Sequence, residues 1–142
     1  MIFLEIFNFD DLHLLAFVGT FMMKGGIILN QVFLVGRLTD KPTVMETESG
    51  KKYTTIVLAV QRAFKNADGK YETDFFRCVL WNGVAANTSE YCQAGDVVGI
   101  KGRLQTRSYE SENKEIKYIT EVIAERVTFL SRNTKDNQEN VK

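Results

Sequence analysis

The chain has 142 residues, of which 44% are hydrophobic and 25% are charged, and its 18 lysines and arginines balance its 18 acidic residues. This length supports one domain with a single core, and the composition is that of an ordinary soluble globular protein. A formal net charge of zero excludes any argument for nucleic-acid binding from bulk charge, so such a function must depend on where the charges lie.

The first 22 residues are rich in Phe, Leu and Ile but do not form a recognisable targeting signal. A secretory signal has a positively charged beginning, whereas the only charged residues before Lys24 are acidic. The longest apolar run is also shorter than the roughly 20 residues that a membrane span needs. We therefore expect residues 1–22 to be an extension without a targeting role, either a short amphipathic helix or residues read from upstream of a natural start at Met22 or Met23, and we expect no membrane association.

The rest of the chain follows a β pattern that is interrupted once. Apolar and β-branched runs bounded by turn residues predict five strands, over 27–38, 51–62, 73–81, 97–110 and 116–130. Residues 63–72, which contain Asp68-Gly69, predict a hairpin loop. The interrupting segment, 82–96, loses the alternation and gains alanines, which predicts a short helix with Gly95 as its C-cap.

Three strands, a short helix and two further strands form the order of the OB-fold, a partly open five-stranded Greek-key barrel. We therefore predict an all-β fold with one helix, in a domain over residues 23–130. An open sandwich of the same strands is the structural alternative. Residues 131–142 are polar and lack aromatic side chains, which predicts a disordered tail.

No signature of catalysis or of metal binding accompanies these elements. The single histidine, His13, lies in the N-terminal extension, so the domain has no histidine to act as a general base. Cys78 and Cys92 have no second pair beside them, which is neither a disulfide framework nor a zinc pattern, and we expect free thiols in a reducing cytosol. The sequence thus predicts a cytoplasmic, non-enzymatic protein without a cofactor or metal.

Cations and aromatic rings share one face of the predicted strands. Alternation along a strand groups Phe75, Arg77 and Trp81, opposite Phe76, Cys78 and Leu80. On the strand 97–110 it groups Lys101, Arg103, Arg107 and Tyr109. The end of the strand 51–62 and the loop after it repeat the mixture with Arg62, Phe64 and Lys65. Rings that stack on bases and cations that follow phosphates suit single-stranded nucleic acid; an ordinary core position is the alternative for each ring.

The same segments resemble the bacterial single-stranded DNA-binding proteins. Five motifs carry the resemblance, in the order of the family: LNQVFLVGRLTDKP (29–42), LAVQRAFKNADG (58–69), DFFRCVLWNGVAAN (74–87), EYCQAGDVVGIKGRLQTRSYE (90–110) and YITEVIAERVTFL (118–130). The resemblance implies an OB-fold subunit, assembled as a homotetramer, that coats single-stranded DNA during replication, recombination and repair in the bacterial cytoplasm, at the nucleoid.

The resemblance also implies roles for individual residues. The base-stacking aromatics of the family fall at Phe64, Phe75, Trp81 and Tyr109, and two of its basic positions fall at Arg77 and Arg107. The assignment of Arg62, Lys65, Lys101 and Arg103 to the same surface rests on the strand faces alone. We expect the oligomer to be held by the strand around residues 28–36, because an exposed apolar edge of that length would otherwise pair nonspecifically.

Two departures from the family pattern bear on partners. Gln93-Ala94 stands where family members often carry basic residues, and the sequence ends in DNQENVK without the acidic, hydrophobic tip that recruits repair and replication enzymes. The resemblance is therefore to a tail-less member, for which we do not expect such recruitment. The alternative function is an OB-fold protein–protein adaptor of the primosome, in which the aromatic face binds another protein.

Overall fold

The computed structural model describes residues 22–23, 26–27 and 29–132. Predictions for residues 1–21 and for the tail beyond Arg132 lie outside the described residues. Contacts divide the chain between Asn30 and Gln31, so the two parts are described separately. In the first part, strand β1 (Met22–Met23) pairs antiparallel with strand β2 (Gly26–Ile27).

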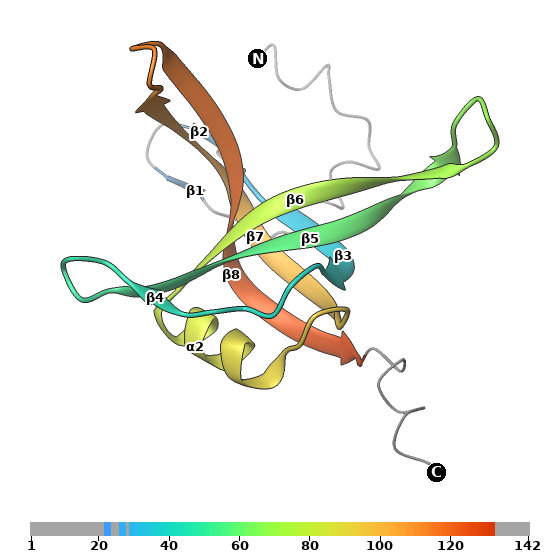
Figure 1. Cartoon of the computed structure of the whole chain (residues 1–142), viewed down its shortest axis with the longest axis horizontal. Coiled ribbons are helices and arrows are strands. Elements are labelled where there is room, and N and C mark those ends of the chain that lie inside the picture. Colours follow the sequence, from blue (N-terminus) through green and yellow to red (C-terminus); the bar gives the residue numbers. More distant parts are fainter. Residues whose placement is uncertain (1–21, 24–25, 28, 133–142) are drawn as a thin grey trace. The chain divides into compact units, whose positions relative to one another are not determined.

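The second part forms a closed β-barrel with one helix (Figure 1). Its elements are β3 (Val32–Leu38), β4 (Met45–Glu46), β5 (Lys52–Lys65), β6 (Tyr71–Trp81), α2 (Asn82–Tyr91), β7 (Val97–Glu110) and β8 (Ile116–Ser131). The strand order is β3-β7-β8-β6-β5-β4, and a short β3–β5 pairing closes the sheet. Strands β6 and β8 run parallel, and the other neighbours run antiparallel. The predicted OB-fold is confirmed, and the open sandwich is wrong.

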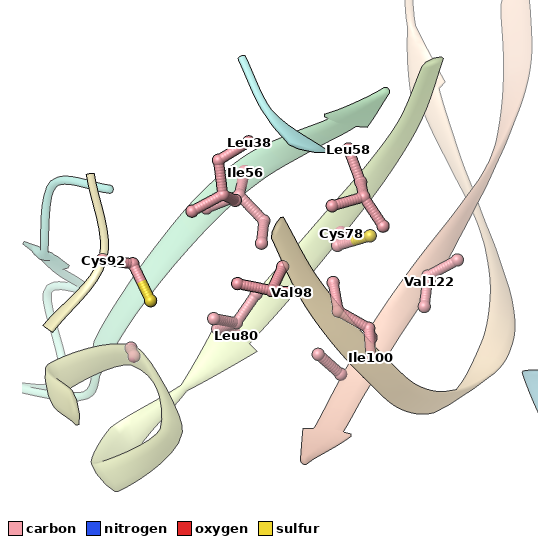
Figure 2. Close-up of a cluster of buried hydrophobic side chains, with 11 residues drawn as sticks. Leu38, Ile56, Leu58, Cys78, Leu80, Cys92, Val98, Ile100 and Val122 are labelled. Carbon is pink, nitrogen blue, oxygen red and sulfur yellow. The ribbon is translucent and has the colours of Figure 1, made fainter. Parts of the chain in front are cut away.

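Alternate residues of the barrel strands point inward and form the core (Figure 2). Within β5, Ile56 and Leu58 are buried, and within β6 the predicted inward positions Cys78 and Leu80 are fully buried. Each buried Val, Ile or Leu side chain stabilises the fold by about 1.5–3 kcal/mol relative to exposure. Phe76, predicted on the same face, is 36% exposed, so it is not a core residue as Cys78 and Leu80 are.

Close approach of neighbouring strands requires glycine at two positions. A Cβ atom on Gly36 would lie 2.4 Å from the Ala59 carbonyl oxygen, at the place where β3 meets β5 and closes the barrel. A Cβ atom on Gly102 would lie 2.2 Å from the Ile123 carbonyl oxygen, beside a register shift in the β7–β8 pairing. These contacts allow the strands to bend around a core that a flat sheet would leave open.

Two hairpins extend beyond the barrel as arms, one made by β5 and β6 and the other by β7 and β8 (Figure 1). The predicted loop 63–72 is wrong in extent, because β5 continues to Lys65 and β6 begins at Tyr71. The turn between them is held by Asn66, whose Oδ1 accepts hydrogen bonds from the backbone N–H groups of Asp68 and Lys70 at 3.0 and 2.9 Å. The first predicted strand, 27–38, is also too long, since β3 begins at Val32.

The helix α2 is shorter than the sequence predicts. It ends at Tyr91, where the Cys92 N–H donates to the Thr88 carbonyl at 3.0 Å. Gly95 is therefore not its C-cap; with a φ of +85° it belongs to the following turn, in which Asp96 accepts the Gln93 N–H at 2.8 Å. No helix in the described part of the chain is long and apolar enough to cross a bilayer.

Candidate nucleic-acid interface

An open hollow of about 420 Å³ lies on the outer face of the neighbouring strands β5, β6, β8 and β7. The lining positions alternate along each strand with the core positions. The hollow is therefore lined by side chains that point away from the interior of the barrel. The lining residues are Thr47, Tyr53, Thr55, Arg77, Val79, Trp81, Arg103, Gln105, Arg107, Glu121 and Ile123. Four of the predicted site residues meet here, namely Arg77, Trp81, Arg103 and Arg107.

Two aromatic rings stand side by side in this hollow. Tyr53 on β5 is the direct cross-strand partner of Trp81 on β6. Their ring centroids lie 5.4 Å apart, with the planes tilted by 39°. Trp81 is 37% exposed and Tyr53 is half-buried. The pair therefore keeps part of its aromatic surface accessible from the hollow, which an ordinary core position would not.

A buried carboxylate holds two arginines in the same hollow. Strand β8 lies between β6 and β7, so Glu121 on β8 stands between Arg77 and Arg107. Arg77 Nε donates to one carboxylate oxygen of Glu121 at 3.3 Å, and Arg107 Nε donates to the other at 3.2 Å. The Glu121 side chain is 6% exposed, whereas those of the arginines are 49% and 43% exposed. Because both bonds use Nε, the terminal N–H groups are left to face other acceptors.

Arg103 supplies a third cation. Its Nη1 donates to the Gln105 side-chain oxygen at 2.7 Å, and this neutral partner does not cancel the charge of the arginine. Three arginines and one glutamate give the lining a formal charge of 3 − 1 = +2. In a chain of zero net charge, positive charge is thus concentrated beside the two aromatic rings.

The other predicted aromatics lie outside this hollow, on the arms. Phe64 and Phe75 on the β5–β6 arm are 86% and 66% exposed, and Tyr109 on the β7–β8 arm is 42% exposed. None of them is a core residue, so the alternative interpretation of these rings is wrong. Phe75 is on the same face of β6 as Arg77 by alternation, which places it next along the strand from the hollow.

The remaining predicted cations have partners within the chain. Arg62 forms ion pairs with Glu72 and, at 2.8 Å, with Asp74; this hydrogen-bonded guanidinium holds the pKa of the Asp74 carboxyl below its usual range. The Lys65 ammonium lies 5.5 Å from the Tyr71 ring centroid. The Lys101 ammonium lies 5.9 Å from the Phe33 ring centroid. The structure therefore does not bring these cations into the hollow.

Sequence reasoning missed two important lining residues. The position of Tyr53 could be predicted from the sequence, because alternation from the apolar positions Ile56 and Leu58 places it on the outer face of β5. The position of Glu121 could not be predicted in this way, since its contacts depend on the parallel pairing of β6 with β8, in which Cys78 lies beside Val122. No local sequence pattern predicts the pairing of β6 with β8.

The fold and the hollow together define an OB-fold protein with a basic and aromatic outer face. Residues 29–130 match the single-strand binding protein family, and the chain belongs to that family.

Three relatives illustrate the similarity. The chain is 50% identical over 103 residues to the single-stranded DNA-binding protein B of Bacillus subtilis, covering 72% of this chain and 91% of the relative. It is 47% identical over 103 residues to the single-stranded DNA-binding protein of Bacillus cereus, covering 72% of this chain but only 61% of that relative. It is 42% identical over 115 residues to the single-stranded DNA-binding protein 1 of Staphylococcus aureus, covering 80% of this chain and 74% of the relative.

Proposed function

We propose that the chain binds single-stranded DNA without regard to sequence and without catalysis. The observation that carries this proposal is the hollow, in which Trp81 lies beside Arg77, Arg103 and Arg107 on one open face. Bases stack on exposed aromatic rings with about 1–3 kcal/mol each, and arginines bind phosphates. The names of the relatives, all single-stranded DNA-binding proteins, support the same ligand.

The arms extend this surface. In the proposed complex the strand of DNA leaves the hollow past Phe75 and Phe64 on one arm and past Tyr109 on the other. Phosphates contact Arg62, Lys65 and Lys101 only where they replace the present partners of these cations. These three residues therefore contribute less to DNA binding than the cations of the hollow. The exposure of these rings on both arms supports this path of the DNA.

Family membership supports a proposal about the biological role and the assembly. We propose a homotetramer in the bacterial cytoplasm, associated with the nucleoid, that protects single-stranded DNA during replication, recombination and repair. Glu121 is the acidic residue of the hollow, and both of its oxygens accept hydrogen bonds from arginines. This engagement favours a binding surface over acid–base chemistry.

Titration of tryptophan fluorescence with oligo-dT tests the proposal, because Trp81 is the only tryptophan. We expect quenching, with affinity that falls steeply between about 50 mM and 200 mM salt as phosphate contacts release counterions. Failure to quench, or tighter binding to duplex than to single strands, would contradict it. Such a result together with capture of a replication protein by the same face would favour the adaptor function.

A matched pair of arginine variants sharpens this test. Arg103→Gln removes a hollow cation with a neutral partner, and we expect the slope of log affinity against log salt to fall by about 0.7, the value for one phosphate contact on a single strand. Arg62→Gln removes a cation that Asp74 and Glu72 already neutralise, so its slope should stay near the wild-type value. Equal changes in the two variants would contradict the assignment of the hollow.

A further inference from the structure

Tyr53 occupies a position that the fold does not require to be aromatic. It lies on the outer face of β5, because the alternating positions Thr54 and Ile56 are buried and fill the inward face. Its hydroxyl lies 4.0 Å from the Met45 sulfur, a weak acceptor. A tyrosine that served only to pack would more often bury its ring and bond its hydroxyl to a stronger acceptor.

Tyr53 lies next to the groups that a nucleotide needs. Its ring is 5.4 Å from that of Trp81, and both line the hollow with the arginines Arg77 and Arg107. A tilt of 39° means that the two rings do not cover each other's faces as a parallel stack would. Each ring therefore retains π surface of its own on which a flat base can lie.

We propose that Tyr53 is a base-contacting residue, and that it forms with Trp81 a two-ring subsite that takes unstacked bases of the single strand. This inference rests on the proposed function. The bases enter the hollow over the tilted pair, and the flanking phosphates face the guanidinium groups held by Glu121. Tyr53 thereby adds a fifth ring to the four predicted from the sequence.

Three variants separate stacking from packing. Tyr53→Phe keeps the ring and should bind oligo-dT like the wild type. Tyr53→Leu keeps apolar contact with Trp81 but removes the π face, and we expect binding to weaken between about 5-fold and 150-fold, the range for loss of one stacked base. Tyr91→Leu, at an exposed tyrosine of α2 outside the hollow, is the matched control and should bind normally. Equal binding by Tyr53→Leu and the wild type would overturn the inference.

Photocrosslinking identifies the contact directly. Single strands that carry 5-iodouracil are irradiated with the wild-type protein, and the crosslinked peptides are identified by mass spectrometry. Attachment at Tyr53 supports the subsite, whereas attachment at Trp81 but never at Tyr53 shows that Tyr53 merely supports Trp81 and overturns the inference. A wild-type protein that fails to bind oligo-dT at all contradicts the proposed function instead, so the two failures are distinguishable.

Discussion

Among single residues, Glu121 combines a buried carboxylate with two arginine partners. A carboxylate that is 6% exposed needs partners that replace its lost hydration, and here Arg77 and Arg107 provide them from opposite sides. The arginines are themselves about half exposed, so water solvates them when the carboxylate is removed. The loss in the free energy of unfolding therefore depends on which charge remains. It is larger when the arginines are removed than when Glu121 is removed.

This asymmetry predicts an unequal set of stability changes. The double variant Arg77→Ala/Arg107→Ala leaves a buried charge without partners, and we expect a loss of about 2–4 kcal/mol in the free energy of unfolding. Adding Glu121→Leu to that double variant should recover most of the loss, because the buried charge is gone. Urea denaturation measures all three proteins. A triple variant no more stable than the double variant would contradict the argument.

Cys78 provides a prediction about pH. Burial raises the pKa of its thiol from 9.0 to about 12. Below pH 9 the thiol is neutral in both the folded and unfolded chains, but above it the unfolded thiol ionises first. This group therefore favours unfolding by up to about 1.4 kcal/mol per pH unit as the pH rises from 9 towards 12.

The variant Cys78→Val isolates this effect from the titration of lysines and tyrosines. Between about pH 8 and pH 10.5 the wild type should lose about 1–2 kcal/mol more stability than Cys78→Val does. Denaturant unfolding at both pH values gives the difference. Parallel losses in the two proteins would show that Cys78 ionises equally in both states, contrary to its burial.

At the scale of elements, the strands were predictable because they obey local alternation. The bounds of β7 (Val97–Glu110) agree with the prediction, since its apolar start and polar loop are explicit in the sequence. The helix end was misplaced, because Gly95 fits a C-cap in sequence but is used by the next turn. Likewise only part of the candidate site was predictable: Trp81 and Arg77 follow from alternation within one strand, whereas the Glu121 cluster depends on which strands become neighbours.

Two glycines differ in whether the fold leaves room for a side chain. Gly36 has no room for a Cβ atom, because the Ala59 carbonyl oxygen would lie 2.4 Å away. We expect Gly36→Ala to destabilise the fold by about 1–3 kcal/mol, as overpacking does. Gly83 lies in α2 with no heavy atom within 4 Å of a Cβ position, so Gly83→Ala should be neutral or stabilising by up to about 1 kcal/mol. Thermal or urea unfolding compares them, and a stable Gly36→Ala protein would show that β3 and β5 need not approach so closely.

At the largest scale, an apolar patch lies on the outside of the barrel that the structure describes. It consists of Phe33 and Val35 on β3 and Leu130 on β8, which are 67%, 59% and 49% exposed. The Val35 and Leu130 side chains flank Gly99, each within 3.9 Å of the position that a Cβ atom would take there. Among the described strands, β3 pairs with β5 only at Arg37 and Leu38, so most of that edge is also open. Apolar side chains beside an open edge favour assembly.

Assembly through this patch predicts that one charge will break it. Val35→Lys places an ammonium group without a partner in the interface, and we expect the proposed oligomer to dissociate towards the 16.2 kDa subunit at micromolar concentration. Tyr91→Lys introduces the same charge at a residue of α2 that is 62% exposed, and it should leave the mass unchanged. Light scattering after size exclusion measures the mass, and circular dichroism checks the fold. If Val35→Lys keeps the wild-type mass, the subunits assemble through another surface, because an unpaired ammonium group at the centre of this patch is incompatible with close apolar contact.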